Sequence, residues 1–242
     1  MAPPARRPAV IFFDVGGTLL HFNVEPSAMF ARIVRDHGVA VEPDALYRAM
    51  REVEATAPDL AGMGAKSEVD YWRAYDASIL RKVGTEPTPR LLDEIAERFR
   101  RELTFEPYPE SLDVLRALRA RGVPLGVISN ASHGIIGDLQ RTGVAGYFEH
   151  VVYSQAVGTA KPDPRIFREA LRRFGVEPGD AWHVGDNVVA DIEGALGVGL
   201  RPVLVRRKGQ EVPEGVDVVE DLRGVAGLLW GDRSVGRAGE RG

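Results

Sequence analysis

The chain has no cysteine among its 242 residues. Disulfides, thiolate metal ligands and cysteine nucleophiles are therefore excluded. The cytoplasm is the simplest location to expect, because oxidising compartments favour disulfides. An excess of basic residues is also lacking, since 31 Lys and Arg stand against 35 Asp and Glu, a formal net charge of −4. Nucleic acids and anionic membranes select basic surfaces, so we expect neither as a partner.

Long apolar segments and lysines are scarce as well. No apolar run approaches the roughly 20 residues that a membrane-spanning helix needs, so no span is predicted. The first apolar run follows two arginines but ends at Asp14, which favours a strand over a signal peptide. Only four of the 31 basic residues are lysine. In so arginine-rich a chain, Lys161 in a loop before a helix indicates a need for a compact ammonium, with chance placement as the alternative.

Strands alternate with helices through most of the chain. The continuous apolar run at 9–13 is typical of a parallel strand that is covered on both faces. Later strands are predicted at 124–129, 150–154, 181–186 and 202–205, with helices near 109–121, 132–141, 164–174 and 186–197. This alternation predicts an α/β fold with a doubly wound parallel sheet.

Residues 26–105 break this alternation and contain helical patterns only. Helices are predicted at 27–37, 43–56, 68–83 and 88–103. We interpret this segment as an inserted α-helical cap over 23–105, and residues 1–22 and 106–242 as the catalytic core. Tyr71, Trp72 and Tyr75 recur at helical spacing, which favours the core of the cap over the lining of a pocket.

Three acidic side chains lie at or just after predicted strand ends. Asp14 follows the strand at 9–13, Asp186 ends the strand at 181–186, and Asp191 is about one helical turn further on. Ligands of open parallel sheets bind beyond the carboxyl ends of the strands, so these acids share one cleft if their strands are neighbours. Carboxylate oxygens suit Mg²⁺, and their mutual repulsion favours a cation. For each acid alone, a helix cap or a turn is the alternative interpretation.

Polar and basic residues accompany these acids. Ser129 and Asn130 end another strand, and Lys161 lies in the Pro-rich loop before the helix at 164–174. The Ser129 hydroxyl and the Lys161 ammonium can hold the oxygens of an anionic group. Singly these are ordinary cap or loop residues, but their combination at strand ends favours a catalytic cleft. The chain contains neither G-x-G-x-x-G after the first strand nor G-x-x-x-x-G-K-[ST], which excludes the common dinucleotide and P-loop motifs.

In this order the residues resemble the motifs of the haloacid dehalogenase superfamily. The matching stretches are DVGGT from Asp14, SN from Ser129, KPDP from Lys161 and GDNVVAD around Asp186. The resemblance covers roughly residues 9 to 230, including a helical cap inserted after the first motif. It implies a Rossmann-type core and a hydrolase that acts on a small phosphorylated metabolite.

By this resemblance Asp14 is the nucleophile and becomes an aspartyl phosphate, a covalent route that is open to carboxylates. Thr18 and Ser129 contact the phosphoryl oxygens, and Asn130 belongs to the same motif as Ser129. Lys161 stabilises the charge that develops during transfer.

The resemblance also implies Mg²⁺ as the cofactor. Its ligands are Asp14, the backbone carbonyl of Gly16 and Asp186, with Asp191 either as a ligand or as a support for the other ligands. The sequence identifies neither the substrate nor a protein partner.

Gly16 departs from the phosphatase pattern, which usually has an aspartate two residues after the nucleophile. That aspartate protonates the leaving alcohol, a contribution of roughly 10²–10⁴-fold, so we expect a slow phosphatase or one suited to good leaving groups. His21 is the nearest residue that can replace it, although a plain loop histidine is the simpler interpretation. One alternative is a 2-haloacid dehalogenase, which needs neither this acid nor a metal.

Two further alternatives remain open for this chain. Phosphonate hydrolases also replace the second aspartate, but they use a cap lysine, for which Lys66 and Lys82 are the candidates. A catalytically weakened member that binds a phosphorylated ligand or a protein partner is the other. Retention of both acids in GDNVVAD favours Mg²⁺ and phosphate over the dehalogenase.

Overall fold

The computed structural model describes residues 7–56, 67–207 and 213–230, so Lys66 and the polar tail after Trp230 lie outside the described residues. The chain divides into two compact units, Met1–His21 with Glu106–Gly242, and Phe22–Phe105. Phe22 falls in the second unit, one residue earlier than the predicted boundary. Its ring stacks on Phe105 with ring centroids 4.2 Å apart, which links it to the other end of that unit.

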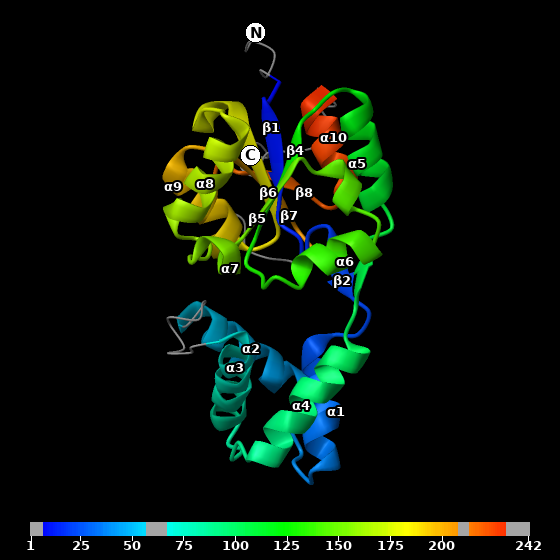
Figure 1. Ribbon diagram of the computed structural model, residues 1–242, viewed down its shortest axis with the longest axis vertical. Helices are drawn as coiled ribbons and strands as arrows, with labels where there is room; N and C mark the ends of the chain where they lie inside the picture. The colour runs from blue at the N-terminus through cyan, green and yellow to red at the C-terminus, as the bar shows by residue number, and fades with distance from the viewer. Residues whose placement is uncertain (1–6, 57–66, 208–212, 231–242) are drawn as a thin grey trace. The chain divides into compact units, whose positions relative to one another are not determined.

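The first unit is built on a six-stranded sheet with the order β5-β4-β1-β6-β7-β8, and its neighbouring strands are parallel (Figure 1). The strands are β1 (Val10–Phe13), β4 (Leu125–Ser129), β5 (His150–Tyr153), β6 (Ala181–Gly185), β7 (Arg201–Val205) and β8 (Asp217–Val219). The predicted α/β fold with a doubly wound parallel sheet is confirmed.

The central strand β1 is apolar and fully buried along its length. Phe12 lies opposite Gly126 of β4 and His183 of β6. A Cβ at Gly126 would lie 2.8 Å from the rings of Phe12 and Phe174, so glycine makes room for two aromatic side chains here. Burial on both faces explains why this strand has a continuous apolar run and no alternation.

Helices cover both faces of the sheet, with α5 and α10 on one side and α8 and α9 on the other (Figure 1). The helices of this unit are α5 (Ser111–Ala120), α6 (Ile135–Arg141), α7 (Ser154–Val157), α8 (Pro164–Phe174), α9 (Gly194–Val198) and α10 (Arg223–Trp230), with short 3-10 turns at Ala145–Tyr147 and Pro178–Asp180. The helix predicted over 186–197 is instead a π-helical turn, Val188–Glu193, that runs into α9. Asn187 caps this turn by accepting from the amides of Val189 and Ala190.

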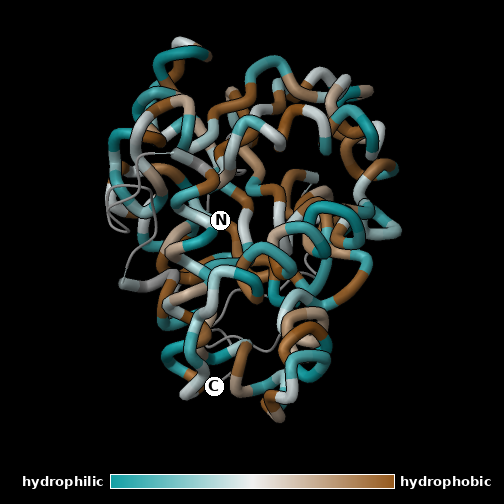
Figure 2. The backbone as a smooth tube through the Cα atoms, turned by 60° about the horizontal axis from the view of Figure 1, so that its bottom comes forward, coloured by the Kyte–Doolittle hydropathy of each residue, from teal (hydrophilic) through white to brown (hydrophobic). Residues whose placement is uncertain are grey.

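Among its described residues, the second unit contains four helices with a hydrophobic core of their own. They are α1 (Pro26–Asp36), α2 (Pro43–Thr56), α3 (Glu68–Lys82) and α4 (Pro89–Glu102). Tyr75 lies in this core, but the exposed fraction of Trp72 is 46%, so the interpretation of both as core residues is wrong for Trp72. Figure 2 shows hydrophobic and hydrophilic residues alternating along the helical coils, as amphipathic helices require.

A two-stranded sheet, β2 (Leu20–Phe22) with β3 (Phe105–Pro107), lies where the chain passes between the two units. The sequence analysis placed the boundaries between cap and core here and did not detect the strands, because three-residue strands carry no readable alternation. None of the described helices has the length and apolar character that a membrane span requires.

Candidate active site

The carboxyl ends of β1, β4 and β6 carry most of the predicted site residues. Because β1 lies between β4 and β6, the residues that follow these three strands meet at one edge of the sheet. Asp14 follows β1, Ser129 ends β4, and Asp186 follows β6. The loop before α8 adds Lys161, and the π-helical turn adds Asp191. The structure therefore brings together residues that are up to 177 positions apart in the chain.

Lys161 is at the centre of this group, with 2% of its side chain exposed. Its ammonium donates to Asp14 Oδ1 at 2.7 Å, to Asp191 Oδ1 at 2.6 Å and to the carbonyl of Ile128 at 2.8 Å. An ammonium has three protons, so these contacts use its full donor capacity. This arrangement fixes the ammonium against the predicted nucleophile.

Asn130 holds the backbone of Lys161 from both sides. Its Nδ2 donates to the Lys161 carbonyl at 2.9 Å, and its Oδ1 accepts from the Lys161 amide at 2.7 Å. The side chain thus acts as a clamp between the end of β4 and the loop before α8. This contact gives Asn130 a positioning role for Lys161.

Asp191 is tied to protein donors through both carboxylate oxygens. Oδ1 accepts from Lys161 and from His183 Nε2 at 2.9 Å, and Oδ2 accepts from the amide of Asn187 at 3.0 Å. Burial opposes ionisation, but the Lys161 ammonium and the His183 bond outweigh it and hold the pKa of Asp191 below its usual range. For Lys161, burial is likewise outweighed by Asp14 and Asp191, which raise the pKa of the ammonium. Lys161 and Asp191 thus form a buried ion pair that stays charged.

The pKa values of Asp14 and Asp186 shift in the opposite direction, above their usual range. Burial raises the pKa of Asp14 to about 6, with the Asp191 charge adding to it and Lys161 opposing it. Burial, together with the charges of Asp14 and Asp191, raises the pKa of Asp186 to about 7. These are carboxylates for which the nearby charges and the buried surroundings favour the protonated form. A cation between them would reverse this preference.

The loop after β1 brings the Asp186 carboxyl close to the backbone. Gly17 has φ of +85°, and a Cβ at this position would lie 2.5 Å from Asp186 Oδ2, so glycine is required on both counts. The buried Thr18 donates from Oγ1 to Asp186 Oδ1 at 3.3 Å. Gly16, the position that lacks the usual acid, is exposed.

The acidic residues fit a metal ion. One oxygen from each of Asp14, Asp186 and Asp191 can be chosen so that the three lie within 4.8 Å of one another. With all three carboxylates ionised and Lys161 protonated, the group carries a net charge of −2, which matches a divalent cation. Both oxygens of Asp191 already accept hydrogen bonds from protein donors, which limits Asp191 as a direct ligand.

Sequence analysis missed His183, which is fully buried. Burial lowers its pKa, and its Nδ1 has no hydrogen-bond partner among the described residues. The ring is therefore neutral, with the proton on Nε2 facing Asp191. The sequence offered one signal for it, an imidazole inside an otherwise apolar strand two residues before the GD motif.

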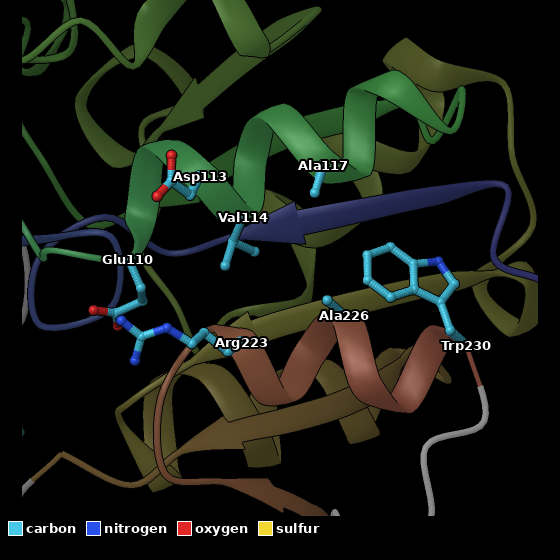
Figure 3. Close-up of a pocket in the computed structure, with 7 residues that line it drawn as sticks. All are labelled: Glu110, Asp113, Val114, Ala117, Arg223, Ala226 and Trp230. Atoms are coloured by element: carbon cyan, nitrogen blue, oxygen red, sulfur yellow. The ribbon is translucent and has the colours of Figure 1, made fainter.

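Other residues that the sequence analysis considered lie apart from this group. Lys82 pairs with Glu52 of α2 at 2.7 Å. The His21 ring lies against Tyr108, with ring centroids 4.9 Å apart. A groove of about 290 Å³ between α5 and α10 is also separate, because none of the predicted site residues lines it (Figure 3).

Comparison with known proteins agrees with this geometry. A family model described as "haloacid dehalogenase-like hydrolase" matches residues 8–199. The human haloacid dehalogenase-like hydrolase domain-containing protein 3 is 32% identical over 203 residues, which cover 81% of each protein. A glyceraldehyde 3-phosphate phosphatase of Methanopyrus kandleri is 32% identical over 88% of this chain and 91% of that protein. A crystal structure of a dehalogenase with an intermediate complex superposes with a TM-score of 0.71 at 22% identity, covering 92% of this chain and 97% of that one, which shows the shared fold.

Proposed function

Because the chain belongs to the haloacid dehalogenase-like hydrolases and is an enzyme of that family, we propose that it hydrolyses phosphate monoesters of small metabolites with Mg²⁺ bound. The observation that carries this proposal is the charge of the site. Among the described residues, Asp14, Asp186 and Asp191 are accompanied by one ammonium, that of Lys161, which leaves −2 for a cation to balance. A 2-haloacid dehalogenase needs no metal ion, so it does not require excess negative charge beside its nucleophile.

Mg²⁺ would be held by Asp14, Asp186 and the backbone carbonyl of Gly16, with Asp191 orienting Lys161. Bound there, the ion would offset the negative charge of the phosphate as it approaches a carboxylate. The raised pKa values of Asp14 and Asp186 support this assignment, since both carboxyls gain from a nearby cation.

The reaction begins with attack of an Asp14 carboxylate oxygen on phosphorus. The new oxygen–phosphorus bond forms as the bond to the substrate oxygen breaks, and because no acid stands at position 16, the leaving oxygen departs as an anion that solvent water then protonates. Thr18 and Ser129 donate hydrogen bonds to the phosphoryl oxygens in this proposal, and the positive charge of Lys161, whose three protons are bound by Asp14, Asp191 and the Ile128 carbonyl, stabilises the charge that develops during transfer. Water then cleaves the aspartyl phosphate and restores Asp14.

The class of substrate rests on the relatives. The Methanopyrus kandleri protein is named for a small phosphorylated metabolite, and its match extends over both units of this chain. A small phosphorylated metabolite is therefore the proposed substrate. The 2-haloacid dehalogenase remains the second candidate, because Gly16 lacks the acid that phosphatases use.

A screen of phosphorylated metabolites with and without Mg²⁺ tests the proposal, with 2-chloropropionate assayed for halide release in parallel. We expect phosphate release that is lost with EDTA and restored by Mg²⁺. Halide release that persists in EDTA would support the dehalogenase instead. Failure to release either product, with Mg²⁺ present, would support a weakened member that only binds its ligand.

A further inference from the structure

Arg207 connects two stretches of chain in the first unit that are far apart in sequence. It lies just beyond the end of β7. Its Nη2 donates to the backbone carbonyl of Thr18 at 3.0 Å and is 2.7 Å from Glu110 Oε1. Its guanidinium covers the Tyr108 ring, 3.6 Å from the ring centroid. One side chain therefore contacts both the loop after β1 and the linker that returns from the second unit.

The Arg207–Glu110 pair is nearly excluded from solvent, with side-chain exposures of 11% and 5%. Glu110 directly precedes α5, at one end of the α5–α10 groove (Figure 3). Arg207 Nε and Glu110 Oε1 lack hydrogen-bond partners among the described residues, so the ion pair, the ring stack and the hydrogen bond to the Thr18 carbonyl hold the guanidinium. Breaking a buried pair leaves an uncompensated charge, and lysine cannot reproduce the planar stack.

The loop that Arg207 holds is the one that carries Thr18. The Thr18 hydroxyl lies 3.3 Å from Asp186 Oδ1, while its carbonyl accepts from Arg207. The next carbonyl, of Leu19, accepts from the Tyr108 amide at 3.1 Å and from Ser111 Oγ at 2.7 Å. Two successive carbonyls of this loop are thus bound. Arg207 binds that of Thr18, and Tyr108 and Ser111 bind that of Leu19.

We propose that Arg207 is a positioning residue that fixes Thr18 beside Asp186 by tying the loop after β1 to Tyr108 and Glu110. The proposal rests on the proposed function, in which Thr18 contacts the phosphoryl group. Arg207 acts through the Thr18 backbone, so its effect falls on turnover more than on substrate affinity.

The neighbouring Arg206 supplies a matched control. It forms the equivalent pair with Glu220 at the surface, where 40% of the Arg206 side chain and 70% of the Glu220 side chain are exposed. We expect Arg207→Lys to lower kcat for an aryl phosphate by about 10- to 100-fold, with KM changed by less than about threefold. Arg206→Lys should leave both within about twofold.

If Arg207→Lys does not fold, Glu110→Gln tests the same positioning role, with Glu220→Gln as its control. It keeps the shape of the side chain and removes the charge that holds Arg207, so a smaller loss of kcat is expected. Hydrogen exchange gives a readout that does not need turnover. Amides of residues 16–20 and those of Glu106, Tyr108 and Glu110 should exchange faster in Arg207→Lys than in Arg206→Lys.

The outcomes separate the two proposals. If the wild type hydrolyses phosphate esters and Arg207→Lys keeps its kcat, the positioning role is overturned, whatever the exchange shows. If the wild type has no phosphatase activity, the proposed function fails, and exchange alone decides whether Arg207 holds the loop. Equal exchange in the two lysine variants then overturns the role of Arg207.

Discussion

At the scale of single residues, the site depends on how one ammonium is shared. Lys161 contacts Asp14 and Asp191 at 2.7 and 2.6 Å, and Asp191 is also bound by His183. Asp191 remains ionised, while burial favours the protonated form of Asp14. The two acids therefore differ although both contact Lys161: Asp191 is a fixed counter-charge, and Asp14 is the acid that we propose as the nucleophile.

Asp14→Asn tests the nucleophile directly. The amide has nearly the same shape but cannot attack phosphorus as an anion, and Lys161 keeps its bond to Asp191. We expect turnover to fall by about 10³-fold or more, with the folded structure unchanged by circular dichroism. Asp113→Asn, at an exposed acid of α5, is the control and should keep wild-type activity. Near-normal turnover in Asp14→Asn would rule out the covalent route.

Gly16 leads to a prediction about leaving groups. Without an acid at this position, an alkyl phosphate must leave as a poor alkoxide, whereas an aryl phosphate leaves as a stable anion. Aryl phosphates should therefore react faster by about 10²-fold or more, and Gly16→Asp should narrow the gap. The measurement is kcat/KM for esters of graded leaving-group pKa.

The same ester series shows whether the leaving group lacks a proton donor or receives its proton from His21. Residue 16 is exposed. A flat dependence in the wild type would contradict the missing acid. A steep dependence that appears only in His21→Ala would assign the proton to His21.

At the scale of elements, α3 combines exposed and buried polar groups in one helix. Its N-cap Ser67 accepts from the amide of Asp70 at 3.1 Å, which satisfies one free amide of the first turn. Further along, Tyr75 and Asp76 are each 7% exposed, while Trp72 is 46% exposed. The helix therefore buries a carboxyl beside an aromatic residue of the core. Burial raises the pKa of Asp76 to about 7.

Asp76→Asn should stabilise the protein at alkaline pH. The folded pKa is about 7 against the usual 3.8 of an aspartate, so the folded state binds more protons and the free energy of unfolding falls as pH rises between these values. Asparagine resembles the protonated form and has no such loss. We expect a gain of about 2–4 kcal/mol at pH 8 and little change at pH 4, measured by urea unfolding. Asp113→Asn is the exposed control, and an Asp76→Asn variant that is no more stable at pH 8 would refute the prediction.

At the scale of the whole molecule, the sheet places charges that the chain keeps far apart. Asp14 and Asp186 directly follow the neighbouring strands β1 and β6, and burial raises the pKa of each, to about 6 and about 7. Without a cation, ionising them destabilises the fold as pH rises through these values. Binding of a cation to the folded state alone would recover that loss.

Stabilisation by Mg²⁺ should therefore depend on pH. Below about pH 6 both carboxyls hold protons that compete with the ion, whereas above about pH 7 they are ionised. At pH 8 and a concentration of 100 Kd, Mg²⁺ should raise Tm by about 5–10 °C, with a much smaller shift at pH 5. Sodium chloride of equal ionic strength controls for screening.

Asp186→Ala provides the matching variant for this experiment. It removes one hard ligand and should abolish most of the Mg²⁺ shift at pH 8 together with activity. A shift that survives in Asp186→Ala, or one that is equal at pH 5 and pH 8, would contradict the site.

The sequence alone determined the alternation of strands and helices, the inserted helical segment and the residues at the strand ends. These features are local, since periodicity and position at the end of an apolar run can be read from neighbouring residues. It also determined the charge types of the site, because Asp14, Lys161, Asp186 and Asp191 follow recognisable stretches.

Only the tertiary structure decided how these residues share their contacts. Arg206 and Arg207 are adjacent and identical in type, yet one pairs at the surface and the other reaches Thr18, 189 positions away. His183 and Gly17 likewise acquire their importance from Asp191 and Asp186, which the sheet brings next to them. Such contacts depend on strand order and on burial between distant segments, and neither leaves a periodic pattern in the chain.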